Sequence, residues 1–444
     1  MRGRTRAFSG FLPATLCCLA ANAGAALAAD LPVKAPFGLL PNIEMTSQGW
    51  TATFASEIRY YSWAGDVGFA PRNAPENVRG GGSQLYIPFA LQISGKPHED
   101  FKFEILGRGG WVDSRQTTPG LSGAVSTFTD TAISATTTYF GFNGVQPFVS
   151  LNGNIPTGRS SLSGAQANAR MDPDLVEIGS FGEGWNVGPT VGVNVPLTAN
   201  LIWTTSAGYT WRGPFNREDS LAPTDPTVQT ASNVDPGDVF TVTSSVGYQN
   251  GAFAGMISGT VSWETATTEN GMALYRPGTR DRLTGTWSYP SDDFGVTTLS
   301  AAAAHSERNE VLFLAATALA TEPFNTNSNL YRVGLEHLFP LGQLWMGPVA
   351  SYLHRDRNSY DSGTLQFVPA KTRLSAGVVA RMAVGDTVTF NARAEHVWTR
   401  QNEDPAPGDQ RASVLAGGSP VVGIPVPVVS SKGWQFAFGA NVRY

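Results

Sequence analysis

The segment Gly433–Tyr444, GWQFAFGANVRY, decides the fold of this chain. Its apolar side chains share one parity: Trp434, Phe436, Phe438, Ala440, Val442 and Tyr444. The other parity carries polar ones: Gln435, Asn441 and Arg443. Because strand side chains alternate between two faces, one face can meet lipid while the other meets water. This pattern also occurs in edge strands of soluble sheets, but here it predicts the closing strand of an outer-membrane β-barrel. The expected signal for the barrel-assembly machinery is formed by Trp434, Phe436, Phe438, Val442 and Tyr444.

The first residues indicate export. Arg2, Arg4 and Arg6 precede an apolar run that ends in small residues at Ala26 and Ala28, which predicts a signal peptide over residues 1–28. A membrane anchor is the alternative. We then expect a periplasmic N-terminal segment at 29–48 and a barrel at 49–444. Both cysteines lie inside the predicted signal, so the mature chain is expected to have no disulfide and no cysteine metal ligand.

Composition supports the barrel. The 30 basic and 35 acidic residues give a net charge of -5, and removal of the three signal arginines makes it -8, which argues against nucleic acid as a partner. Beyond the signal, no stretch approaches the roughly 18 apolar residues of a membrane helix. The 11 Trp, 12 Tyr, 24 Phe and 49 Gly suit a wall that is apolar on alternate residues and carries aromatic girdles.

Alternation between turn signals predicts an all-β fold, a transmembrane antiparallel up-and-down β-barrel of about sixteen strands, with fourteen to eighteen possible. The candidate strands are 49–63, 83–95, 101–113, 128–141, 148–157, 185–197, 201–213, 238–249, 252–264, 279–290, 294–307, 328–339, 344–356, 371–384, 388–400 and 433–444. Short turns alternate with long loops at 64–82, 114–127, 158–184, 214–237, 265–278, 308–327, 357–370 and 401–432. Bacterial barrels have short periplasmic turns and long outer loops, which fits this order.

Charged residues on the polar parity are expected to line the lumen, because an arginine or lysine facing lipid costs about 2 to 4 kcal/mol at mid-membrane. The expected lumen residues are Glu57, Arg59, Lys102, Glu104, Arg108, Arg212, Arg280, Arg282, Arg332, Glu336, Lys371, Arg373, Arg381, Arg393, Glu395 and Arg443. Arginine and lysine outnumber the acidic residues in this set, which predicts a channel with mild anion selectivity. Neutralising Arg280, Arg282 and Arg373 together is expected to weaken that selectivity. The alternative is that these charges pair and only fill the barrel.

The long loops carry acidic residues, among them Asp172, Asp174 and Glu177. These residues either bridge cations to lipopolysaccharide or form a solvated surface. Two loop stretches are apolar instead, and we expect a hydrophobic capture site there, formed by Val311, Leu312, Phe313, Leu314, Val414, Leu415, Val421 and Val422. Alternatively, these stretches cap the barrel or extend its strands above the membrane.

No enzyme is expected, and no cofactor or metal. The sequence has no GxSxG, HExxH or Walker motif, and its five histidines are scattered.

The run Asn154–Gly158, Asn-Ile-Pro-Thr-Gly, is followed by a long loop and then by Gly184–Pro189, Gly-Trp-Asn-Val-Gly-Pro. This pair of segments resembles the phenol-degradation meta-pathway family of outer-membrane proteins, which are often labelled simply as transporters. The resemblance implies a barrel that passes aromatic or other hydrophobic compounds. No segment matches the constriction loop of general trimeric porins.

The sequence therefore predicts a channel or transporter in the outer membrane of a Gram-negative bacterium, surrounded by lipid and lipopolysaccharide, that passes a small solute. One alternative is a hydrophobic-compound channel with a plug at 30–47, and another is a structural or adhesive barrel. The substrate and the oligomeric state are not predicted.

Overall fold

The computed structural model describes residues 49–66, 79–118, 121–142, 144–218, 231–250, 253–291, 294–313, 316–360, 367–401, 413–414, 420–421 and 429–444. The predicted signal peptide and the segment at 29–48 lie outside these residues and stay predictions.

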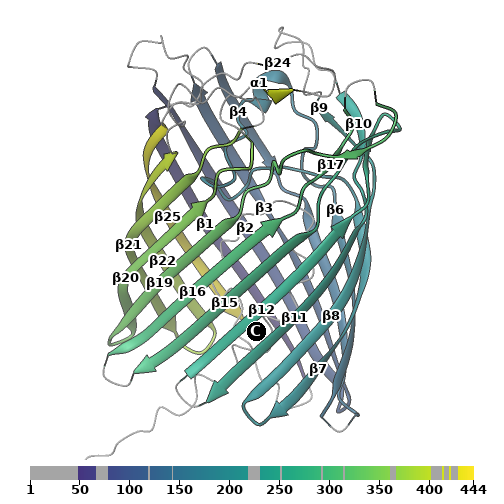
Figure 1. Ribbon diagram of the computed structural model, residues 1–444. Coiled ribbons are helices and arrows are strands. Elements are labelled where there is room, and N and C mark those ends of the chain that lie inside the picture. Colours follow the sequence, from purple (N-terminus) through teal and green to yellow (C-terminus); the bar gives the residue numbers. More distant parts are fainter. Residues whose placement is uncertain are drawn as a thin grey trace, which may run out of the picture.

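The chain forms a closed antiparallel barrel with sixteen strand positions in its wall (Figure 1). The wall strands are β1 (Trp50–Asp66), β2 (Arg79–His98), β3 (Phe101–Thr118), β5 (Thr131–Tyr139), β6 (Gln146–Ile155), β7 (Asn186–Thr198), β8 (Leu201–Arg212), β11 (Val239–Asn250), β12 (Phe253–Glu264), β15 (Arg280–Ser291), β16 (Gly295–Ser306), β19 (Leu330–Leu341), β20 (Leu344–Arg355), β21 (Lys371–Val384), β22 (Val388–Gln401) and β25 (Val429–Arg443). The first strand pairs with the last, Ile58 opposite Phe438, which closes the wall. The predicted fold class and strand number are confirmed.

A β-bulge interrupts the third hairpin. The strand β4 (Leu121–Phe128) pairs with the outer half of β3, and β5 pairs with its inner half, so β4 and β5 occupy one wall position. Phe128 lies opposite Trp111 and Ala132 opposite Arg108, so three residues face two. The expected long loop at 114–127 is wrong, because alternating residues there extend the hairpin outward.

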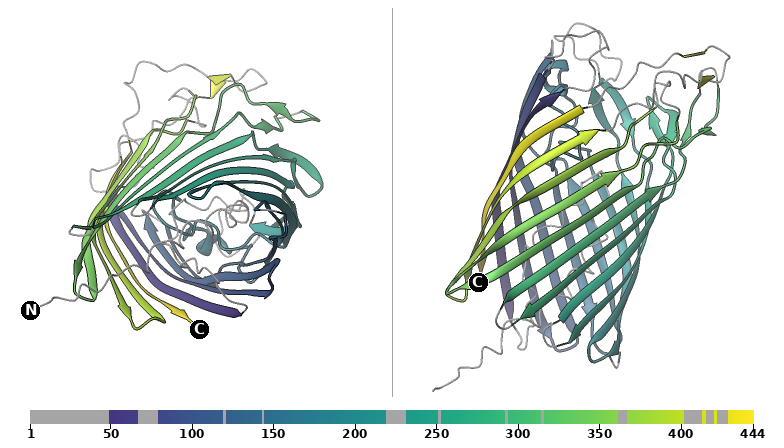
Figure 2. Two further views of the ribbon diagram at one scale, coloured as in Figure 1. Left: turned by 90° about the horizontal axis from the view of Figure 1, so that it is seen from below. Right: turned by 60° about the vertical axis from the view of Figure 1, so that its left-hand side comes forward.

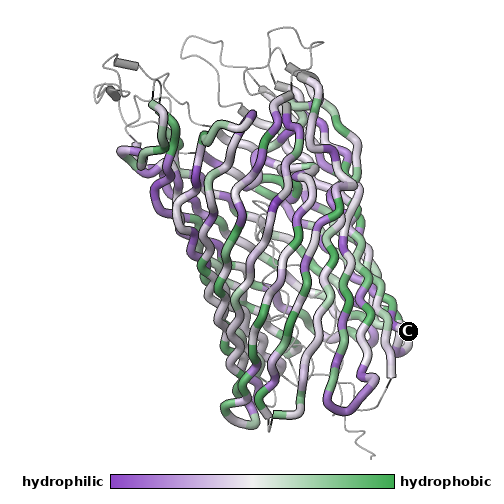
Figure 3. Tube along the Cα trace, turned by 90° about the vertical axis from the view of Figure 1, so that its right-hand side faces the viewer, coloured by the Kyte–Doolittle hydropathy of each residue, from purple (hydrophilic) through white to green (hydrophobic). Residues whose placement is uncertain are grey.

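The outer face of the barrel is apolar and half-exposed, with aliphatic side chains such as Leu151, Val191, Leu283 and Val378 around its middle. Aromatic residues form a band near the short turns: Trp50, Phe101, Phe142, Tyr248, Tyr289, Phe294 and Phe339. A second band lies near the long loops: Trp185, Trp211, Phe240, Trp263, Tyr331, Tyr352, Trp398 and Trp434. Hydrophobic and hydrophilic stretches are interspersed along the wall strands that face the viewer in Figure 3. An apolar belt between two aromatic girdles is the surface that a barrel presents to a membrane.

Beyond the wall, short strands from the long loops pair as a second sheet that continues the wall outward. They are β9 (Phe215–Glu218), β10 (Ala231–Asp235), β13 (Thr267–Glu269), β14 (Met272–Arg276), β17 (Glu310–Val311) and β18 (Ala320–Thr321). Another loop forms the hairpin β23 (Ser413–Val414) and β24 (Pro420–Val421). The one described helix, α1 (Gly164–Ala167), begins at Ser163, whose side chain forms a capping box with Gln166. No helix in the described part of the chain is long and apolar enough to cross a membrane.

Candidate functional site: the barrel lumen

Residues 156–184, between β6 and β7, fold into the lumen, and we call them the lumen segment. The view along the barrel axis shows α1 inside the ring of strands (Figure 2). The Ser114 hydroxyl, fully buried on the inner face of β3, donates to the carbonyl of Ala169 at 2.9 Å. The amide of Gln84 pairs with both backbone groups of Ile178, at 2.8 and 3.1 Å. The expectation that residues 158–184 form an outer loop is therefore wrong.

Two apolar clusters fix this segment to the wall. Leu162, Ala169, Ile178 and Phe181 of the segment pack against Val112 and Val125 of β3 and β4. A second cluster joins Met171 and Val176 of the segment to Tyr61 of β1 and Val397 of β22. Burial of one such side chain stabilises the folded state by about 1.5 to 3 kcal/mol. Apolar residues at inward positions thus serve to hold the segment.

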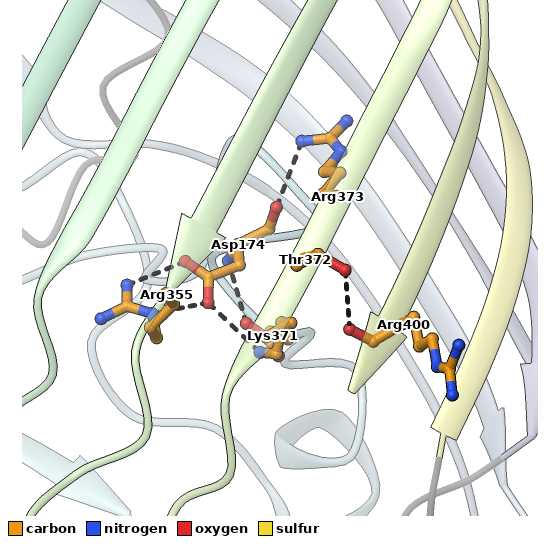
Figure 4. Close-up of polar contacts among 7 residues, drawn as sticks. Asp174, Arg355, Lys371, Thr372, Arg373 and Arg400 are labelled. Atoms are coloured by element: carbon orange, nitrogen blue, oxygen red, sulfur yellow. Dashed lines mark hydrogen bonds and ion pairs between the residues drawn. The ribbon is translucent and has the colours of Figure 1, made fainter. Parts of the chain in front are cut away.

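The tip of the lumen segment is also bound to the wall by ion pairs (Figure 4). The buried carboxylate of Asp174 accepts two hydrogen bonds from Arg355, both at 2.8 Å, and pairs with Lys371 at 3.2 Å. Lys371 also pairs with Asp172. Deeper in the lumen, Glu177 pairs with Arg59 of β1. These loop carboxylates therefore face the wall, and neither of the two roles expected for them, cation bridge or solvated surface, describes these three.

Arg373 lies at the junction of the wall and the segment. Its guanidinium donates to the carbonyl of Asp174 at 3.1 Å and to the side chain of Gln435 at 3.0 Å, and it lies 5.5 Å from the ring centre of Tyr61. Only 7% of Arg373 is exposed, and its Nε has no hydrogen-bond partner. Arg373 thus supports the segment directly.

Most of the other predicted lumen charges form pairs. Such pairs join Arg59 with Glu57, Lys102 with Glu104, Arg393 with Glu395, Arg381 with Glu336, and both Arg212 and Arg280 with Glu264. Arg108, Arg282 and Arg332 also occupy inward positions, whereas Arg443 lies exposed near the short turns. Within the described residues Arg282 has no ion pair, and its Nε has no hydrogen-bond partner. Charge pairing therefore describes most of the predicted set.

Sequence reasoning overlooked a wall of hydroxyl groups. From β7 to β16 the inward positions carry small polar residues, among them Thr190, Thr204, Ser206, Thr210, Thr241, Thr243, Ser245, Ser258, Thr260, Ser262, Thr284, Ser288, Thr298 and Ser300. On these described strands, inward charges occur only toward the outer ends, at Arg212, Glu264, Arg280 and Arg282. We call this face the hydroxyl wall. The lumen segment docks on the other side, against β1 to β4 and β20 to β22.

The predicted capture residues are only partly described. Val311 lies in β17, where it pairs with Tyr275 and Ala320, and Leu312 and Phe313 follow it, half-buried. Val414 and Val421 belong to the β23–β24 hairpin. Leu314, Leu415 and Val422 lie outside the described residues. The described part of the first stretch extends the wall above the membrane, and its role in capture stays a prediction.

The predicted assembly residues occupy the lipid-facing side of β25. Trp434, Phe436 and Phe438 are 45 to 55% exposed, and Val442 shares their face. Tyr444 exchanges two backbone hydrogen bonds with Ala52 of β1, at 2.8 and 3.2 Å.

In the described ranges, no group of three or more His, Cys, Asp or Glu side chains could hold a metal ion.

The closed sixteen-stranded wall and its apolar belt define a β-barrel of the outer-membrane type. No family model matches the chain, and no curated protein matches its sequence. The resemblance to the phenol-degradation family therefore stays a prediction.

Among solved structures, a FadL homologue from Pseudomonas aeruginosa is 9% identical, with coverage of 88% of this chain and 90% of that one and a TM-score of 0.38. An anion-selective porin from Comamonas acidovorans is 12% identical, with coverage of 90% and 99% and a TM-score of 0.35. An outer-membrane channel from Pseudomonas putida F1 is 12% identical, with coverage of 66% and 99% and a TM-score of 0.35.

Proposed function

We propose that this chain is a channel for small polar solutes, which cross the outer membrane along the hydroxyl wall. The observation that carries the proposal is the division of the lumen: the lumen segment docks on one side, and the other side carries hydroxyl groups. A hydroxyl both donates and accepts hydrogen bonds, so it can replace water around a polar solute as the solute moves. A recess of about 10 Å³ in this wall, room for roughly one water molecule, is lined by Thr190, Ser206, Gly208, Thr210, Thr241 and Thr243.

Replacing Thr204, Thr241 and Thr243 together with valine tests this path. Each lost hydrogen bond is worth about 0.5 to 1.5 kcal/mol, so we expect arabinose flux in a liposome-swelling assay to fall roughly tenfold. The control is Thr205→Val, on the opposite face of β8. Unchanged arabinose flux in the triple variant would contradict a hydroxyl path.

A second candidate, passage of hydrophobic compounds, is favoured by an inward apolar cluster of Leu338, Val349 and Val379, with Trp345 packed against it. This candidate also includes the capture loops and the phenol-degradation resemblance. It predicts that the triple valine variant takes up radiolabelled toluene as fast as the wild type or faster. The same variant therefore separates the two candidates.

Anion preference is expected to depend on Arg282 and Arg332. Arg332 interacts electrostatically with both Arg282 and Arg373, and the carboxylates of Asp174 and Glu177 offset part of the positive potential on this part of the wall. Neutralising Arg280 or Arg373 would not test ion selectivity cleanly. Arg280 pairs with Glu264, and Arg373 holds the lumen segment through the carbonyl of Asp174.

We expect the double variant Arg282→Gln/Arg332→Gln to move the reversal potential measured in a salt gradient toward zero by several millivolts. Arg400→Gln, at an exposed position on the outer face of β22, should leave it unchanged. Cation selectivity in the wild type would contradict the prediction.

A further inference from the structure

Both ends of the lumen segment are bound by one side chain, that of Asp130. One carboxylate oxygen accepts the N–H of Gly158 at 2.9 Å, and the other accepts the N–H of Glu183 at 2.7 Å. The second oxygen also accepts the amide of Asn154 at 3.0 Å. A single carboxylate thus joins the point where the chain enters the lumen to the point where it leaves.

The β-bulge between β4 and β5 places this carboxylate. Inward positions are odd-numbered on β4, where Val125 is buried, whereas on β5 the odd-numbered Ile133 is exposed to the outside. The extra residue changes the parity, and the N–H of Thr129 still donates to Gly110 at 2.8 Å. Bulges re-aim side chains in this way. If the register of β4 continued without a bulge, Asp130 would lie opposite Gly109 and point to the lipid side.

The two chain ends also lie in direct contact. A Cβ atom on Gly158 would lie 1.9 Å from the carbonyl oxygen of Phe181, and one on Gly182 would lie 2.9 Å from the backbone of Gly158. Asn154 donates to the carbonyl of Gly184 at 2.9 Å, and Gly184 has a φ of +82°. The two sequence motifs that suggested a family, Asn154–Gly158 and the run from Gly184, therefore form the two sides of one neck.

We propose that Asp130 is a positioning residue for the lumen segment and so determines the size limit of the channel. The inference rests on the proposed channel function. The ion pairs of Asp174 and Glu177 hold the tip, and Asp130 holds the base. Loss of the base contact lets the whole segment shift within the lumen.

The test compares Asp130→Ala with Asp130→Asn, which keeps one acceptor oxygen. The main readout is amide exchange at Ile178, whose N–H bonds to the side chain of Gln84 and not to Asp130. We expect exchange there at least tenfold faster in Asp130→Ala and an intermediate rate in Asp130→Asn, because hydrogen bonds to charged groups are among the strongest in proteins. The control is Asp113→Ala, whose carboxylate pairs with Arg115 outside the lumen segment.

Single-channel recordings in planar bilayers provide the second readout. We expect Asp130→Ala to show larger and more variable conductance, with the heat-modifiable migration of the barrel unchanged. Wild-type exchange at Ile178 in Asp130→Ala would overturn the inference. If Asp130→Ala does not assemble, Asn154→Ala tests the same neck and must also accelerate exchange at Ile178. A wild-type protein that conducts nothing would refute the channel function, while exchange at Ile178 would still report on the neck.

Discussion

Deletion of Gly433–Tyr444 is expected to abolish assembly of the barrel. Within this range β25 pairs with β1 on one side and with β22 on the other, so its loss leaves two strand edges without partners. Each unpaired backbone group in lipid costs several kcal/mol, and no other described strand can satisfy them.

Heat-modifiable migration on gels and the amount of protein in the membrane measure this result. Tyr444→Asp is expected to reduce both, because it places a charge on the lipid-facing side. The neighbouring change Arg443→Gln is the control, since Arg443 lies on the other face, and it should assemble normally. Normal migration of the deletion variant would be incompatible with the closed barrel.

Asp174→Asn is expected to release the tip of the lumen segment. The change removes the negative charge that pairs with Arg355 and Lys371, and the side chain of Asp174 is only 7% exposed. Removing one partner of a buried ion pair costs about 3 to 5 kcal/mol, so the undocked population should rise at least a hundredfold.

Single-channel conductance should increase in Asp174→Asn and fluctuate between levels. Asp172→Asn is the matched control, because the only ion pair of Asp172 within the described residues is with Lys371 and its side chain is 34% exposed. The Asp172 carboxylate also accepts the N–H of Asp174 at 2.9 Å, which the asparagine oxygen can still accept, so the effect should be smaller. Equal conductance of Asp174→Asn and the wild type would show that the tip contributes nothing to the constriction.

Acid should release the tip of the segment in the same way. Burial raises the pKa of the Asp174 carboxyl. The hydrogen bonds from Arg355 and the charge of Lys371 lower this pKa by more than burial raises it, so the net pKa is below the ordinary value of 3.8. Docking stability is therefore fully present above pH 4 to 5 and is lost as the pH falls through the lowered pKa. We expect wild-type conductance to be constant from pH 5 to 8 and to rise below pH 4, and this rise should be absent in Asp174→Asn.

The wall was predictable because its strands must alternate. A residue facing lipid cannot be charged at low cost, so the parity of Phe101 and Lys102, or of Trp434 and Gln435, assigns the two faces directly. The same argument located the sixteen strands and assigned the predicted lumen charges to the inward parity, although Arg443 lies exposed near the short turns. It could not show that Thr129, Asp130 and Thr131 form a bulge, because one extra residue leaves no mark in the composition.

The lumen segment was missed because its acidic residues resemble those of a solvated loop. The signal that was available is the apolar set Leu162, Met171, Val176, Ile178 and Phe181, which is too hydrophobic for an exposed loop. Their partners, such as Ser114 and Gln84, carry no special signal. The hydroxyl wall was visible in the sequence, but serine and threonine on an inner parity are also what a wet strand face favours, so they did not stand out from the charges.

The close approach of Gly158 to Phe181 has a consequence for the redesign of this protein. Because the chain leaves and re-enters the wall at nearly the same point, residues 159–180 can be exchanged for another sequence without changing any strand register. An engineer who keeps Asn154, Gly158 and Gly184 can graft peptides of different length there and obtain pores of different calibre from one scaffold.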